Sequence, residues 1–137
     1  MIIDATNLIL GRLASFAAKK ALEGESIIVV NADKAIISGK KEDVMEKYKQ
    51  RIERGDPLRG PYFPKTPDRL VRRAIRGMLP YKKDRGRKAF KKVMCYMGVP
   101  DEYKNQKIET IKEANISRLK VSKYISIEEL TKQLKLR

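Results

Sequence analysis

The residues of this sequence that are best suited to chemistry are four arginines, Arg69, Arg72, Arg73 and Arg76. At 100° per residue they follow the i, i+3, i+4, i+7 rule and share one stripe of a helix, while the apolar residues between them fall on the opposite side. A guanidinium group holds a phosphate through a planar fork of donors, so this row predicts binding of a polyanion. The alternative is the solvated face of an ordinary amphipathic helix.

The neighbouring sequence favours the first interpretation. Between residues 54 and 92 fourteen lysines or arginines stand against three acids, and Tyr62 and Phe63 lie within a stretch rich in proline and glycine. Cations interleaved with aromatic rings suit RNA, whose unpaired bases stack on flat side chains. The alternative for the two rings is a clip that holds the loop on the core. The candidate RNA-binding residues are Arg54, Arg59, Arg69, Arg72, Arg73, Arg76, Lys82, Lys83, Arg85, Arg87, Lys88, Lys91 and Lys92, with Lys40 and Lys41 as secondary candidates.

The net charge of +15 is concentrated in the middle of the 137-residue chain. Residues 1–37 are neutral overall, residues 38–92 carry +12 and residues 93–137 carry +3. Such a local excess indicates a polyanionic partner, either nucleic acid or an anionic membrane surface. We expect no membrane contact, because the arginine-bearing helix is short and lacks the aromatic residues of interfacial helices. A cytoplasmic location is expected, since the N-terminal residues lack the pattern of a signal peptide.

Enzymatic chemistry is poorly represented in the sequence. Histidine, the commonest general base and metal ligand, is missing, and a single cysteine cannot build a zinc site. Neither of the glycine-rich phosphate-binding patterns follows the first expected strand. Carboxylates such as Asp4 and Asp33 could be paired in space, although seventeen acids make such pairing unsurprising. We therefore expect no catalytic residue, no metal and no cofactor, and we interpret Cys95, in an apolar context, as a small core residue.

Hydrophobic spacing predicts a βαβ unit followed by several further elements. A short buried strand, a helix closed by Gly24, and a β-branched strand account for residues 1–30, with a turn at residues 31–33. The remaining expected elements are a strand at 35–37, helices at 40–52 and 84–92, and a strand at 93–97.

Two further stretches have clear local signals. Residues 54–67 form an expected extended basic loop, because their prolines and glycines disfavour both helix and strand. Thr66, Pro67 and Asp68 then have the order of a helix cap, a first helical residue and an acid that matches the helix dipole. In the C-terminal tail at 101–137, residues 126–129 match a capping box that begins a last helix. We expect a single domain over 1–137.

An ordered series of motifs resembles the family of ribosomal protein thirteen of the large subunit, in its archaeal and eukaryotic branch. The motifs are Leu-Gly-Arg-Leu-Ala-Ser at 10–15, Val-Asn-Ala-Asp-Lys at 30–34, Ser-Gly-Lys at 38–40, Arg-Gly-Pro-Tyr at 59–62 and Arg-Gly-Met-Leu-Pro at 76–80. The resemblance covers about residues 1–100. It implies an α/β fold with three α/β/α layers around a small, mostly parallel sheet of about four strands, to which the basic extension and the C-terminal helix are added.

The resemblance also implies a structural role in the large ribosomal subunit, with large-subunit rRNA and neighbouring ribosomal proteins as partners and no small-molecule substrate. It further implies a contribution to early subunit assembly. Two alternatives stay open at this point. One is a free RNA-binding regulator of translation, and the other is an RNA-processing enzyme on a similar α/β core, which would need a pocket with a perturbed carboxylate.

Overall fold

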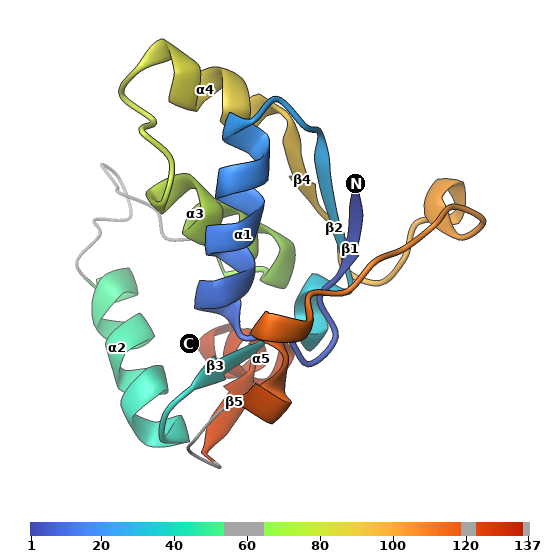
Figure 1. The fold of residues 1–137 in the computed structure, drawn as a ribbon. Helices are drawn as coiled ribbons and strands as arrows, with labels where there is room; N and C mark the ends of the chain where they lie inside the picture. Colours follow the sequence, from blue (N-terminus) through green and yellow to red (C-terminus); the bar gives the residue numbers. More distant parts are fainter. Residues whose placement is uncertain (54–64, 119–122, 136–137) are drawn as a thin grey trace.

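A computed structural model describes residues 1–53, 65–118 and 123–135 of the chain (Figure 1). The helices are α1 (Leu10–Leu22), α2 (Lys41–Glu53), α3 (Pro67–Gly77), α4 (Asp84–Lys91) and α5 (Ile127–Lys135). The strands are β1 (Ile2–Asp4), β2 (Ile27–Val30), β3 (Ile36–Ser38), β4 (Val93–Cys95) and β5 (Tyr124–Ser126). Short 3₁₀ turns are η1 (Ala32–Lys34), η2 (Asp101–Tyr103), η3 (Lys112–Ala114) and η4 (Ile116–Arg118). Each helix expected from the sequence is present, and α2 and α4 begin and end within one residue of their expected bounds.

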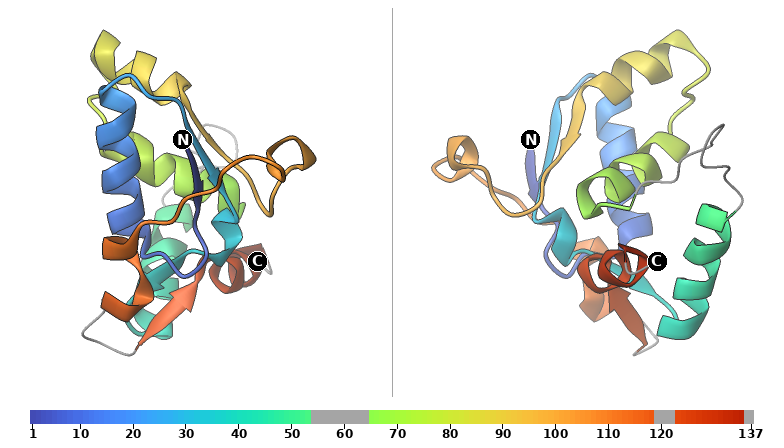
Figure 2. Two further views of the ribbon diagram at one scale, coloured as in Figure 1. Left: turned by 45° about the vertical axis from the view of Figure 1, so that its right-hand side comes forward. Right: turned by 180° about the vertical axis from the view of Figure 1, so that it is seen from behind.

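The expected βαβ unit is confirmed and forms the centre of an α/β fold. Strands β1 and β2 are parallel, with Ile2 opposite Ile28, and β4 adds to the far side of β2 in parallel. Helix α1 buries its apolar stripe, including Leu13 and Ala17, against this sheet and against α3. Because both crossovers advance in the same direction across the sheet, α1, α3 and α4 lie on one face (Figure 2).

The sheet differs from the expectation in where its remaining strands lie. The strand expected at 35–37 does not join the parallel sheet, because β3 pairs antiparallel with β5 in a separate two-stranded sheet. The parallel sheet is instead extended at its β1 edge by an isolated bridge between Ile3 and Glu109. Helices α2 and α5 pack together beside the β3–β5 pair.

The turn after β2 explains why β3 leaves the first sheet. Asn31 has a left-handed backbone with φ 56° and donates from its side chain to Asp4 Oδ1 at 3.0 Å. The same carboxylate oxygen accepts the N–H of Thr6 at 2.9 Å and its hydroxyl at 2.7 Å. Asp4 thus joins the ends of β1 and β2, and the chain is redirected through η1 before β3 begins.

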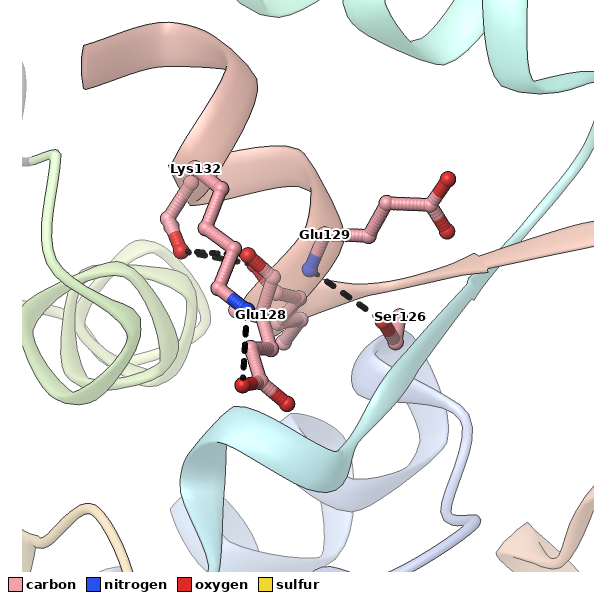
Figure 3. A network of polar contacts seen from close by, with 6 residues as sticks. Ser126, Glu128, Glu129 and Lys132 are labelled. Carbon is pink, nitrogen blue, oxygen red and sulfur yellow. Dashed lines mark hydrogen bonds and ion pairs between the residues drawn. The ribbon is translucent and has the colours of Figure 1, made fainter. Parts of the chain in front are cut away.

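The capping box expected at the start of α5 is half confirmed (Figure 3). Ser126 Oγ accepts the N–H of Glu129 at 3.2 Å, as an N-cap side chain should. In a complete capping box the Glu129 carboxylate would accept the backbone N–H of Ser126. It pairs instead with Lys41 Nζ at 3.3 Å and so links α5 to the start of α2. Lys132 and Glu128 form a further ion pair along the helix at 3.3 Å.

Cys95 is buried in the core, as expected, on the face of β4 that meets the helices. Burial raises the pKa of its thiol to about 12, so the reactive thiolate is scarce in the folded protein at neutral pH. The only cysteine of the chain is therefore a protected group that becomes reactive when the core opens.

Candidate nucleic-acid interface

Helix α3 begins where the sequence predicts, with Thr66 at the N-cap and Pro67 as the first helical residue. The Thr66 hydroxyl makes no capping hydrogen bond, so the position of the start depends on Pro67, whose fixed φ favours a first helical turn, and on the dipole-matched Asp68. Leu70, Val71 and Ile75 are buried and attach the helix to the core. This docking determines which arginines of the row face outward.

The expectation that all four arginines are presented outward is wrong for Arg72. Its Nε donates to the carbonyl of Val93 at 2.9 Å and its Nη2 to that of Phe90 at 3.3 Å. Its guanidinium carbon also lies 3.9 Å from the centre of the Phe90 ring. Arg72 lies at one margin of the stripe, and α4 and β4 pack on that side of α3. Its side chain therefore joins α3 to the junction between α4 and β4.

We predict that replacing Arg72 with methionine destabilises the isolated protein by about 2 kcal/mol, because charged donors to buried carbonyls contribute more than ordinary hydrogen bonds. Methionine keeps the aliphatic stem and removes only the guanidinium group. Arg69→Met is the matched control, since Arg69 is exposed on the same helix and should change the free energy of unfolding by less than about 0.5 kcal/mol. Urea unfolding measures both, and equal values for the two variants would contradict the structural role of Arg72.

The outward part of the row consists of Arg69 and Arg73, which are exposed, and the half-buried Arg76. Partial desolvation and the nearby charges of Arg76 and Arg51 lower the pKa of Arg73. Arg51 belongs to α2, and its guanidinium lies 5.1 Å from the centre of the Tyr48 ring. Like charges from two helices therefore lie within electrostatic range of one another at this place.

Arg51 was missed by the sequence reasoning, although one signal could have found it. It lies between the inward positions Tyr48 and Ile52 of α2, so it falls beside the face that meets the rest of the protein. A cation at such a position reaches whatever packs next to the helix. Only the tertiary structure, which brings Arg51 within electrostatic range of α3, shows that the neighbour is Arg73.

The second set of expected cations surrounds α4. Lys82, Lys83, Arg85, Arg87, Lys88, Lys91 and Lys92 are all exposed in the described structure. Two of them also have partners within the protein. Arg87 pairs with Asp84 at 2.8 Å, and Lys92 Nζ donates to the carbonyl of Gly24 at 3.3 Å. Gly86 and Ala89 form the buried side of the helix, so the opposite side presents its charges to solvent.

The two secondary candidates lie away from α3 and α4, at the other end of α2. Lys40 and Lys41 line an open cleft together with Glu42, Lys123 and Tyr124. Tyr124 is the first residue of β5, and Lys123 comes directly before it. The sequence did not predict that this segment lies next to residue 40. Lys41 is partly neutralised by its ion pair with Glu129. The predicted residues Arg54 and Arg59, and the rings Tyr62 and Phe63, lie outside the described residues.

Asp4, one of the carboxylates considered for catalysis, accepts hydrogen bonds that give it a structural role. Burial acts to raise the pKa of Asp4, but hydrogen bonds from Thr6 and Asn31 outweigh it and hold the pKa below its ordinary value. Asp4 is therefore a poor proton acceptor, occupied with joining two strands. Within residues 1–53, 65–118 and 123–135, no three acidic or cysteine side chains gather as a metal site would require. Among these residues there is also no helix long and apolar enough to cross a membrane.

The chain is similar along most of its length to known proteins. The profile of the family described as Ribosomal protein L13 matches residues 1–102. A relative from Methanopyrus kandleri is 49% identical over 97% of this chain and 85% of its own length. Relatives from Archaeoglobus fulgidus and Methanosarcina barkeri are 46% and 49% identical over 97% of this chain and 86% and 96% of their own lengths. All three carry the description "Large ribosomal subunit protein uL13". With a matching profile over most of its residues and such relatives along nearly its whole length, the chain belongs to the ribosomal protein L13 family.

Proposed function

We propose that the chain is a structural, non-enzymatic constituent of the large ribosomal subunit and binds folded large-subunit rRNA through its basic surface. The description of its relatives supports the assignment to that particle. The observation that supports RNA binding is the arrangement of exposed cations on α3, on α4 and on the turn between them. These elements are attached to the core by Leu70, Val71 and Ala89, so the fold presents the charges on firmly docked helices.

The contacts in this proposal are mainly with the phosphate backbone. Arg69 and Arg73 supply forked donors from one helix, and the lysines of the α3–α4 turn and of α4 supply point charges beside them. Arg51 of α2 lies within electrostatic range of Arg73 and adds a further cation to this surface. Binding of this kind follows the shape of folded RNA, which agrees with a role in early subunit assembly next to neighbouring ribosomal proteins.

Sedimentation of the tagged chain in a cytoplasmic extract tests the proposed function. We expect the protein in the large-subunit fractions of a sucrose gradient, and we expect ribonuclease treatment or raised salt to move it to the top, because phosphate contacts weaken as salt increases. The control is a tagged protein without a basic surface, run in the same extract. A chain that stays at the top at low salt and captures one message would favour the free regulator instead.

A further inference from the structure

Four side chains around the junction of α3 and α4 form a continuous row with an arginine at each end and two aromatic rings between them, which we call the aromatic–arginine ladder. Arg72 lies over the Phe90 ring at 3.9 Å, the rings of Phe90 and Tyr81 meet edge to face with centres 5.6 Å apart, and Arg76 lies 5.2 Å from the centre of the Tyr81 ring. The inner end of the ladder is fixed by the hydrogen bonds of Arg72 to two backbone carbonyls. Its outer end consists of Tyr81, which is exposed in the turn between the two helices (Figure 1), and Arg76 from the last turn of α3.

Tyr81 at the outer end is exposed and yet held in place. Its exposed fraction is 43%, although it contacts both Phe90 and Arg76. Its own N–H donates to the carbonyl of Leu79 at 2.8 Å, and the N–H of Lys83 donates to the carbonyl of Pro80 at 2.9 Å. Fixing a ring at the surface costs conformational entropy that burial only partly offsets. A partner that binds this ring does not have to order it first, so the contact is preorganised.

The charged groups around Tyr81 indicate the chemistry of that partner. Arg76, Lys82 and Lys83 are cations, and the nearest acid along the turn, Asp84, is paired with Arg87. Met78, which precedes the buried Leu79 in the same segment, is a polarisable apolar side chain with an exposed fraction of 47%. Lysine is depleted at the centres of protein–protein contacts, so Lys82 and Lys83 favour nucleic acid, which offers a flat base beside phosphates. An aromatic ring that contacts one arginine and is followed in the chain by two exposed lysines therefore fits a nucleotide better than an apolar protein surface.

We propose that Tyr81, with Arg76 and Met78, receives an unpaired base of the rRNA, while Lys82 and Lys83 hold the phosphates next to it. This rests on the proposed function, since it names a contact within the same RNA-facing surface. Tyr81 supplies the stacking surface, and Arg76 extends it with a guanidinium plane. The other contacts of the ladder hold the Tyr81 ring in a fixed position relative to the core. Loss of one stacked base weakens its docking roughly 5- to 150-fold.

Chemical probing of assembled large subunits tests this site. Subunits are purified from cells whose only copy of the protein is wild type, Tyr81→Leu or Tyr81→Phe, and the rRNA is treated with dimethyl sulfate and with a ribose-acylating reagent. We expect Tyr81→Leu to raise the reactivity of one local unpaired nucleotide, and Tyr81→Phe to preserve the wild-type pattern because the ring is kept. Ultraviolet irradiation of wild-type subunits should also join Tyr81 to the same nucleotide.

Tyr103→Leu is the matched control. Tyr103 also lies in a turn and beside another ring, that of Tyr96 at 5.9 Å, but its neighbours Asp101 and Glu102 are acidic. The rRNA of this variant should react like wild type around the Tyr81 nucleotide. An unchanged pattern in Tyr81→Leu subunits, or a cross-link from Tyr81 to another protein, overturns the base site. Such subunits would still contain the protein, so the proposed function would stand. A protein missing from large subunits even as wild type would overturn the proposed function itself.

Discussion

Replacing Gly86 with alanine should destabilise the protein by about 3 kcal/mol, at the upper end of the usual cost of overpacking. A Cβ at this position would overlap the carbonyl group of Pro80 and lie 2.9 Å from the nitrogen of Tyr81. These are backbone atoms, which cannot rotate aside as the end of a side chain can. Helix α4 would have to move away from the α3–α4 turn, although Lys83 N–H and Pro80 carbonyl hydrogen-bond across it.

Gly11→Ala is the matched control for this variant. Gly11 lies in α1, and a Cβ there would meet no atom within 4 Å. We expect that change to raise the free energy of unfolding by up to about 1 kcal/mol, because alanine favours a helix over glycine. Urea unfolding measures both variants, and the labelling rate of the protected Cys95 thiol reports independently on opening of the core. If Gly86→Ala were as stable as wild type, the close approach of α4 to the turn would be refuted.

The Gly86 contact also links stability to the proposed RNA surface. The backbone that it touches is that of Pro80 and Tyr81, the residues that place the outer end of the aromatic–arginine ladder. Moving α4 outward would displace Phe90, on which both Tyr81 and Arg72 pack. A Gly86→Ala protein that still folds should therefore also lose the Tyr81 contact with rRNA.

Local signals in the sequence predicted the helices well. The start of α3 follows from Pro67 and Asp68, whose effects operate within one turn and need no tertiary partner. The Ser126 cap of α5 is equally local. The reciprocal half of that capping box failed for a tertiary reason, since Lys41 from α2 offered the Glu129 carboxylate a charged partner.

Strand pairing was harder to predict because it depends on residues far apart in the chain. Residues 35–37 have the apolar character of a strand that could extend the parallel sheet. Their partner, however, is β5, almost ninety residues later, and β5 has only three residues. Three residues are too few for alternation to be recognised, so nothing local distinguishes β5 from the rest of the tail.

The arginine row shows the same limit at the level of single side chains. Periodicity gives the stripe that Arg69, Arg72, Arg73 and Arg76 share, but it cannot tell which margin is covered. Arg72 and Arg73 lie at opposite margins, each beside the apolar side of α3. The packing of α4 and β4 turned Arg72 inward, whereas Arg73 stayed exposed near Arg51. Gly86 was similarly invisible, because a close backbone approach leaves no pattern in the sequence.

The double reversal Arg69→Glu with Arg73→Glu should lower occupancy of the protein on large subunits by at least about tenfold, since each lost contact is charge-assisted and each new carboxylate repels phosphate. These two residues are preferred to Arg72 and Arg76 because both are exposed and neither belongs to the aromatic–arginine ladder. Occupancy is measured by quantitative mass spectrometry of gradient-purified subunits from cells that express tagged variant and untagged wild type together.

The isolated double variant should fold as well as wild type. Both side chains are exposed, so replacing them leaves the buried apolar face of α3 intact. Thermal unfolding should therefore give a midpoint close to that of wild type, which separates a loss of binding from a loss of structure. A fall in the midpoint that accounts for the lost occupancy would argue against a direct RNA contact.

The control reversal Lys104→Glu with Lys107→Glu changes the net charge by the same amount in the segment after β4. Both lysines are exposed and pair with nearby acids, Lys104 with Asp101 at 2.8 Å and Lys107 with Glu109 at 3.5 Å. If overall charge governed assembly, the two double variants would lose occupancy equally. If the α3 face binds phosphates, only the Arg69→Glu, Arg73→Glu variant loses occupancy on large subunits. The remaining bound fraction of this variant should then dissociate at a lower salt concentration than wild type. Retention of the α3 variant at wild-type level would show that Arg69 and Arg73 are solvated surface and do not bind phosphates.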